Sequence, residues 1–196
     1  MFLTALLSFH RARKGAAGAA LLLVACASLP EPVGGPPTTA EAFFLTGRIG
    51  VRHGEEGFNG GVRWTHTSAR DELWILSPLG QAVARVTGAG GAVTLVTSEG
   101  REYQAADAAS LTREVLGWEL PLGGLVYWTM GRPDPASPAE VRYDGAGRLT
   151  SLVQDGWEIR YLAYTDQPGG GSLPRTLSAR RGALEIRLTI DQWAQP

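Results

Sequence analysis

Residues 107–133, DAASLTREVLGWELPLGGLVYWTMGRP, are the one long segment with helical periodicity in a chain whose other patterns are those of short strands. Asp107 is placed to cap a first helix, and Gly117 is placed to end it. Pro121 suits the first turn of a second helix, which Gly131 would end. A helix this apolar must be covered, so we expect a sheet to wrap around it, with the space between them either filled or left for a ligand.

The segments on both sides of these helices alternate between apolar and polar residues, as strands with one buried face do. Asp144-Gly145 and Asp155-Gly156 are strong hairpin signals. The expected strands are 43–52, 57–67, 72–76, 81–87, 92–97, 101–105, 141–143, 149–154, 157–164, 175–180 and 183–193. About eleven antiparallel strands with one helical insertion predict a mainly β fold, either a strongly curved sheet or an open barrel. Such a sheet can enclose a lipophilic ligand when side chains do not fill its interior.

The first 25 residues have the layout of a secretory signal, with a positive region followed by a short apolar run. The run ends in LVAC at 23–26, and Cys26 is the only cysteine in the chain of 196 residues. This sequence resembles the bacterial lipobox, in which the signal peptide is removed before a cysteine that carries diacylglycerol. The alternative is an ordinary signal peptide with an incidental buried cysteine. Acylation would hold the mature protein at a membrane surface without a membrane-spanning segment.

Residues 26–40 are rich in proline and glycine and predict an extended tether, so we expect the folded domain to occupy residues 41–196. Ala27 follows the cysteine, and in the enterobacterial sorting rule this resembles an outer-membrane address. Residues 1–25 hold three of the 18 basic residues and none of the 19 acidic ones, so the rest of the chain carries a net charge of −4. That balance gives no electrostatic indication of nucleic-acid binding.

Catalytic and metal-binding signatures are missing from the sequence. His53 and His66 do not stand at metal-ligand spacings, and no nucleophile elbow or phosphate-binding loop occurs. We therefore expect no enzyme activity, no metal and no cofactor apart from the covalent N-acyl diacylglycerol on Cys26. A hydrolase with two carboxylates brought together from distant strands is an alternative that no motif supports.

The segment Ser77-Pro78-Leu79-Gly80 predicts a tight turn with Leu79 at or near its tip. Turn tips are usually polar, because the backbone there stays hydrated. Leu79 either inserts into an interface or an acyl environment, or folds back over the edge of the sheet.

Four features in the same order resemble the LolB family of outer-membrane lipoproteins: the lipobox, TGRIGV at 46–51, the SPLG turn, and the pattern PLxxLxxWxxG from 121 to 131. The resemblance covers roughly residues 43–193. It implies a half-open antiparallel β-barrel with an inserted helical lid and an apolar cavity for acyl chains. It also implies that Leu79 is the protruding leucine used for membrane insertion. The chain departs from the family before the first strand, where residues 27–40 do not provide the usual amphipathic helix.

The function that this resemblance implies is that of a receptor. The protein would accept lipoproteins from the periplasmic carrier LolA, hold their acyl chains, and insert them into the inner leaflet of the outer membrane. We expect a monomer that faces the periplasm and binds no nucleic acid. The residues expected to line the cavity are Val62, Trp64, Val83, Trp118, Leu122, Leu125, Trp128, Trp157 and Ile159. For each of them ordinary core packing is the alternative, and the corresponding alternative function is a structural or scaffold lipoprotein with a filled β core.

Overall fold

A single antiparallel sheet of eleven strands makes up most of the protein in the computed structural model, which describes residues 42–168 and 170–194. The first series of strands is β1 (Phe43–His53), β2 (Glu56–His66), β3 (Arg70–Leu76), β4 (Ala82–Ala89), β5 (Ala92–Thr97) and β6 (Glu102–Ala105). The second series is β7 (Ala139–Tyr143), β8 (Leu149–Gln154), β9 (Trp157–Asp166), β10 (Ser172–Arg181) and β11 (Leu184–Ala194). The mainly β fold expected from the sequence is confirmed.

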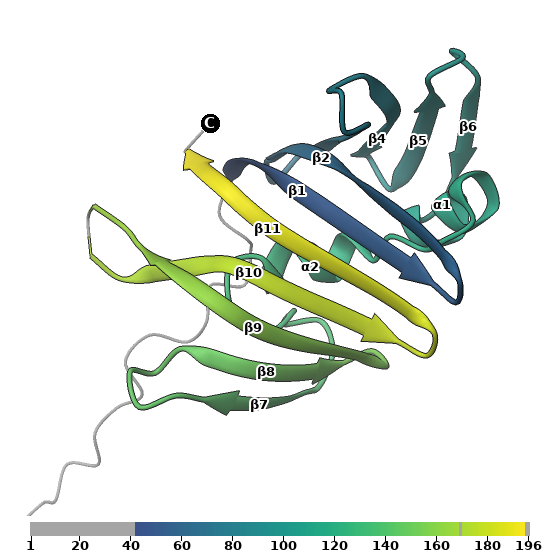
Figure 1. Ribbon diagram of the computed structural model, residues 1–196. Helices are drawn as coiled ribbons and strands as arrows, with labels where there is room; N and C mark the ends of the chain where they lie inside the picture. The colour runs from purple at the N-terminus through teal and green to yellow at the C-terminus, as the bar shows by residue number, and fades with distance from the viewer. Residues whose placement is uncertain (1–41, 169, 195–196) are drawn as a thin grey trace, which may run out of the picture. The chain divides into compact units, whose positions relative to one another are not determined.

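The strands stand in the order β6-β5-β4-β3-β2-β1-β11-β10-β9-β8-β7, so the first and last strands pair in the middle of the sheet. Figure 1 shows the sheet curving around the helices from both sides. Strands β6 and β7 are its two edges and do not pair with each other, so the barrel is half-open. All neighbouring strands are consecutive in the sequence and joined by hairpins, except β1 and β11. Only the tertiary fold brings these two strands together.

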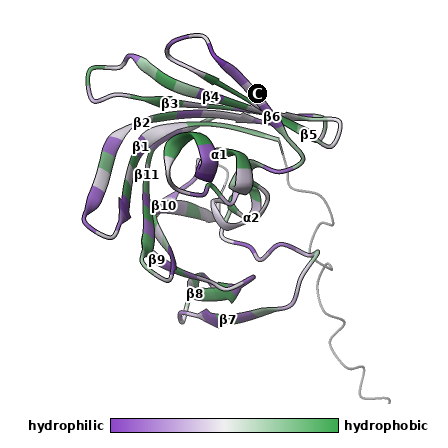
Figure 2. Ribbon diagram, turned by 90° about the vertical axis from the view of Figure 1, so that its right-hand side faces the viewer, coloured by the Kyte–Doolittle hydropathy of each residue, from purple (hydrophilic) through white to green (hydrophobic). Residues whose placement is uncertain are grey.

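Two short helices, α1 (Ala108–Leu116) and α2 (Leu122–Trp128), lie inside the curve of the sheet, as Figure 2 shows from the side. Asp107 caps α1 as expected, because its carboxylate accepts a hydrogen bond of 2.8 Å from the Ser110 backbone N–H. Gly117 ends α1 in the left-handed conformation, with φ of 80°.

The second helix is shorter than the sequence predicted, since it ends at Trp128 rather than at Gly131. The backbone N–H of Met130 donates to Tyr127 O, three residues back, so the chain tightens where another helical turn was expected. Gly131 then turns the chain away with φ of 71°.

The core lies between the concave face of the sheet and the two helices. Trp64, Trp128 and Trp157 are among its largest fully buried side chains. Trp128 from α2 meets Trp157 from β9 with ring centroids 6.2 Å apart, and its Nε1 donates to Gln154 Oε1 at 2.9 Å. The helices are therefore held to the sheet by apolar packing and by a specific buried hydrogen bond.

Three expected segments lie outside the described residues: the signal peptide at 1–25, the acylated Cys26, and the tether at 26–40. Among the described residues, no helix has the length and apolar character that crossing a membrane requires.

Candidate functional site

Leu79 lies in the turn between β3 and β4 and is 88% exposed. Gly80 closes the turn by donating its backbone N–H to Ser77 O at 2.8 Å, and Gln81 accepts from the Ser77 N–H at 2.7 Å. Gly80 has φ of 82°, which glycine adopts without strain. Pro78 and Leu79 thus occupy the two central positions of a tight turn, and the alternative in which Leu79 folds back over the sheet edge does not fit its exposure.

An apolar pocket of about 200 Å³ opens beside this turn, between the sheet and the C-terminal end of α1. Ile75 and Val83, which flank the turn in the sequence, both contribute to its wall. Its lining residues are Val51, His53, Glu56, Gly57, Phe58, Ile75, Val83, Leu116, Gly117 and Trp118. An apolar hollow and an exposed leucine therefore share one hairpin.

The expected cavity residues divide between this pocket and the core. Val83, which is half-buried, and the buried Trp118 line the pocket. Leu122 lines a second, more open pocket of about 450 Å³ near the beginnings of both helices. The others are buried in the core: Val62, Trp64, Leu125, Trp128, Trp157 and Ile159.

Several residues that line the pocket were not among the expected cavity residues, chiefly Val51, Phe58, Ile75 and Leu116. Val51 and Ile75 follow the strand alternation, so the inward face of β1 and β3 was open to prediction. Phe58 stands in the glycine-rich segment EGFNGG, where alternation is hard to detect.

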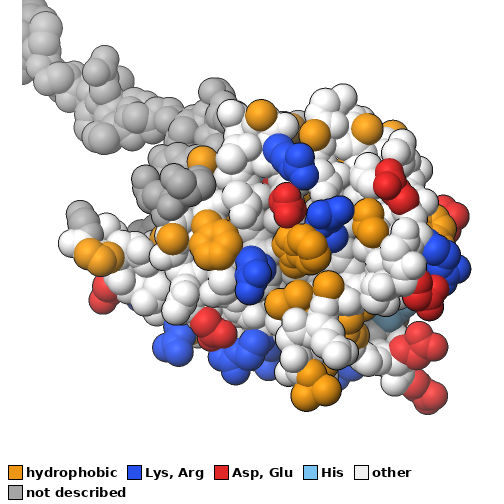
Figure 3. Space-filling model, turned by 90° about the horizontal axis from the view of Figure 1, so that it is seen from above, with side chains coloured by type: hydrophobic (Ala, Val, Ile, Leu, Met, Phe, Trp, Pro, Cys, Tyr) orange, Lys and Arg blue, Asp and Glu red, His pale blue; other side chains and the backbone are white. Residues whose placement is uncertain are grey.

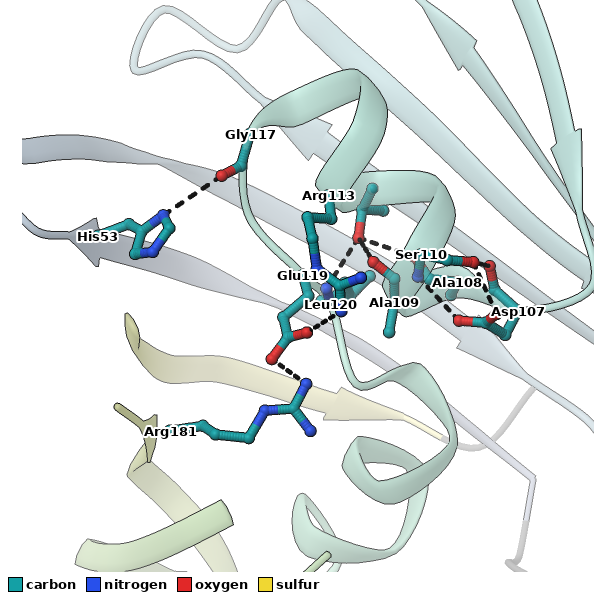
Figure 4. A network of polar contacts seen from close by, with 11 residues as sticks. His53, Asp107, Ala108, Ala109, Ser110, Arg113, Gly117, Glu119, Leu120 and Arg181 are labelled. Carbon is teal, nitrogen blue, oxygen red and sulfur yellow. Dashed lines mark hydrogen bonds and ion pairs between the residues drawn. The ribbon is translucent and has the colours of Figure 1, made fainter. Parts of the chain in front are cut away.

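A cluster of charged residues fixes the segment between α1 and α2, and Figure 4 shows it at close range. Glu119 is only 8% exposed and accepts hydrogen bonds from Arg113 of α1 and from Arg181 at the end of β10. The guanidinium of Arg181 also lies 4.7 Å from the centre of the Trp157 ring. Glu119 thus joins the helices to the turn between β10 and β11.

Three further polar contacts hold the same segment. Thr112 Oγ1 accepts from the Leu120 N–H at 2.8 Å and donates to Ala108 O at 2.7 Å. His53 Nδ1 lies 3.3 Å from Gly117 O, across the mouth of the pocket. Opening the pocket between α1 and the sheet would break or lengthen the His53–Gly117 contact, whereas the two Thr112 bonds stay within the helical segment.

Ionisation of Glu119 reflects two opposing effects. Burial disfavours the carboxylate, but the hydrogen bonds from Arg181 and Arg113 outweigh it and hold the pKa of Glu119 below its ordinary value. The group is therefore charged near neutral pH and binds both arginines as an ion.

Metal-ligating side chains do not converge in the described part of the chain, where no group of three or more His, Cys, Asp or Glu residues could hold an ion. His66 Nδ1 lies 2.8 Å from Asp71 Oδ1, which also accepts from Trp64 Nε1 at 2.9 Å. This network ties β2 to β3, so His66 and Asp71 have a clear structural role.

Comparison with known proteins gives consistent results. The family model described as "Outer membrane lipoprotein LolB" matches residues 41–193. A protein of Nitrosomonas europaea named "Outer-membrane lipoprotein LolB" is 42% identical over 190 residues, covering 90% of this chain and 89% of that relative. One of the same name from Thiobacillus denitrificans is 40% identical over 179 residues, covering 90% of this chain and 94% of the relative.

Among solved structures, the chain resembles a LolA superfamily protein of Nitrosomonas europaea with a TM-score of 0.54. The alignment has 7% sequence identity and covers 80% of this chain and 87% of the other. This likeness concerns the fold alone.

Proposed function

The chain belongs to the LolB family of outer-membrane lipoproteins, and from this membership we propose that it is a receptor that takes lipoproteins from the periplasmic carrier LolA and inserts them into the outer membrane. The outer membrane is its location. The observation that supports the proposal is the pairing of an apolar pocket with an 88% exposed leucine on one hairpin.

The chemical problem in lipoprotein transfer is the exposure of acyl chains to water. Each buried CH₂ contributes about 0.8 kcal/mol, so a chain of about fifteen CH₂ groups strongly favours an apolar site. We place the tips of incoming acyl chains in the pocket beside Val83 and Trp118. The buried residues Val62, Trp64, Leu125, Trp128, Trp157 and Ile159, together with Leu122, would be uncovered as the helices move away from the sheet. No covalent step is involved, and we expect neither enzyme activity nor a cofactor.

Leu79 is proposed to contact the bilayer during delivery. Its side chain is apolar and stands clear of the domain on a turn that closes without it. Such a side chain can enter the acyl region at little cost, whereas a charged side chain there is opposed by several kcal/mol. Cys26 is proposed to carry the lipid anchor, with residues 27–40 as the tether.

The test is a two-stage transfer assay. A labelled lipoprotein bound to the purified carrier is mixed with the receptor in vesicles, and the label is followed first to the receptor and then to the bilayer. Wild type should pass through both stages. Leu79→Glu should accept the label but deliver it about tenfold or more slowly, because a carboxylate resists entry into the bilayer.

Leu162→Glu is the matched control, because Leu162 is also an exposed leucine, 49% accessible, but lies on β9. It should behave as wild type. Full delivery by Leu79→Glu would contradict the role given to Leu79. If a folded receptor took no label at all, the scaffold lipoprotein would be the better description. Mass spectrometry of the same preparation reports whether Cys26 is acylated.

A further inference from the structure

A groove of about 530 Å³ lies on the outer face of the sheet, directly beside the turn that carries Leu79. Ser77, Pro78 and Gly80 form its wall on the side of the turn. Strands β1, β2, β3 and β11 supply the rest: Arg48, Ile49, Gly50, Asn59, Gly60, Gly61, Leu76, Arg187 and Thr189. It is separate from the apolar pocket, which opens on the concave face.

The depth of the groove comes from two glycines in central strands. Gly50 on β1 pairs with Arg187 on β11 and with Asn59 on β2. Two residues along the strands, Gly61 on β2 pairs with Arg48 on β1 and with Leu76 on β3. A glycine at each point leaves a gap between longer side chains. The two gaps are adjacent and form one trough.

Folding alone does not require glycine at these two positions. A Cβ on Gly50 would meet only the Asn59 side-chain oxygen at 3.0 Å, and one on Gly61 would make ordinary contact with the Leu76 side chain at 3.4 Å. Neither glycine has a positive φ. By contrast, a Cβ on Gly60 would collide with the Leu76 backbone oxygen. Because glycine weakens a strand interior, Gly50 and Gly61 indicate the close approach of another molecule.

The charge of the groove selects an anion. Its lining contains Arg48 and Arg187 and no carboxylate. Arg48 forms an ion pair with Asp191, with 3.0 Å between Nη2 and Oδ1. Arg187 is exposed and has no ion-pair partner among the described residues. Since the chain after residue 25 has a net charge of −4, this positive site stands against the overall charge. An arginine without a carboxylate partner is well suited to a phosphate oxygen.

The apolar part of the groove suits a lipid rather than a free ion. Leu76 and Pro78 stand next to the arginines and lead toward Leu79. Figure 3, which views the domain from above, shows hydrophobic, basic and acidic side chains interspersed on that face. The groove lining differs in having no acidic side chain, and arginines beside apolar side chains are typical of surfaces at the level of lipid headgroups. With Cys26 as the anchor, residues 27–41 span at most about 50 Å, which keeps the domain close to the bilayer.

We propose that this groove binds the phosphodiester headgroup of a membrane phospholipid and so seats the domain with Leu79 directed into the bilayer. The proposal rests on the membrane-delivery role given to Leu79. It adds a specific lipid contact that orients the receptor before any cargo arrives.

The test uses the full-length acylated protein in vesicles of phosphatidylethanolamine and phosphatidylglycerol that contain a trace of phospholipid with a photoreactive headgroup. After irradiation, labelled peptides are identified by mass spectrometry. Labels should concentrate in residues 47–61 and 76–80 and around Arg187. Arg187→Gln should reduce them about fivefold, the factor expected for one arginine near an anionic surface. Gly50→Leu should also reduce them, because its side chain fills the trough.

Two control variants match these changes elsewhere on the surface. Arg142→Gln removes an exposed arginine from β7, and Gly145→Leu adds a side chain where no atom lies within 4 Å. Both should leave headgroup labelling unchanged. Labelling spread evenly over the domain, or unaffected by Arg187→Gln and Gly50→Leu, would overturn the proposal.

The alternative ligand for this groove is an acidic surface of a carrier protein. In that case both groove variants would keep wild-type headgroup labelling but accept less lipoprotein from the carrier, and the lipid site would be refuted. Labelling is measured without carrier or cargo, so it remains readable even if Leu79→Glu proves fully active in delivery.

Discussion

Glu119 shows how one side chain can control the attachment of the helices. It is buried between two arginines from different parts of the fold, Arg113 and Arg181. Replacing the carboxylate by an amide keeps its shape but removes the charge that both guanidinium groups bind. Since hydrogen bonds to charged groups contribute about 1.5–3 kcal/mol, the effect is large enough to measure.

We expect Glu119→Gln to lower the free energy of unfolding by about 2 kcal/mol near neutral pH. The pKa of Glu119 in the folded protein lies below the ordinary 4.5, so its contribution is present above pH 4.5 and is lost as the pH falls through the folded pKa. Denaturant unfolding at a series of pH values measures this. The gap between wild type and variant should shrink in acid.

Glu114→Gln provides the control for this pH dependence, because Glu114 is exposed on the same helix. It should change stability little at any pH. A gap between wild type and Glu119→Gln that stays constant with pH would show that the loss comes from packing rather than from charge.

At the scale of elements, one of the two glycines of α2 makes room for the Trp128 indole of the same helix. A Cβ on Gly124 would overlap the Trp128 indole, whereas a Cβ on Gly123 would meet no atom within 4 Å. The indole cannot move aside easily, because it is buried and its Nε1 donates to Gln154 Oε1 at 2.9 Å. Adjacent glycines in one helix therefore serve different purposes.

Alanine substitutions separate these purposes. Gly123→Ala should raise the free energy of unfolding by about 1 kcal/mol, because alanine favours helix over glycine by that amount. Gly124→Ala should lower the free energy of unfolding by about 1–2 kcal/mol. The steric strain of the added methyl group against Trp128 exceeds the gain in helix propensity. Thermal unfolding compares the two directly, and equal stabilisation by both would mean that Trp128 shifts freely.

Strands could be predicted from this sequence because their signals are local. The turns at Asp144-Gly145 and Asp155-Gly156 and the alternation along β11 needed no tertiary information, and Asp107 and Gly117 bounded α1 correctly. The predicted end of α2 was wrong because Met130 continues the apolar pattern of the helix. Its backbone N–H donates to Tyr127 O, three residues back rather than four, so the α-helix has already ended. The pairing of β1 with β11 and the cluster around Glu119 join residues more than sixty positions apart, which no local pattern reveals.

At the scale of the whole molecule, the apolar pocket is too small for the cargo proposed. It measures about 200 Å³, whereas pockets that enclose even a drug-sized molecule measure about 300–1,000 Å³. The sheet is a continuous ladder of antiparallel pairs, while the helices are held to it by side-chain packing and a few polar contacts. Separation of the helices from the concave face is therefore the least costly way to enlarge the pocket.

Hydrogen–deuterium exchange should detect this movement. When acylated cargo is bound, amides of α1, α2 and the Glu119 segment should exchange faster, because these elements leave their packed positions. Amides of β1 and β11 should exchange as in the free protein, because their pairing lies at the centre of the sheet. A non-acylated form of the same cargo is the control and should change neither set. Unchanged or slower exchange in both helices under acylated cargo would mean that the acyl chains bind without opening the core, and the roles given to Trp128, Trp157 and Ile159 would fail with it.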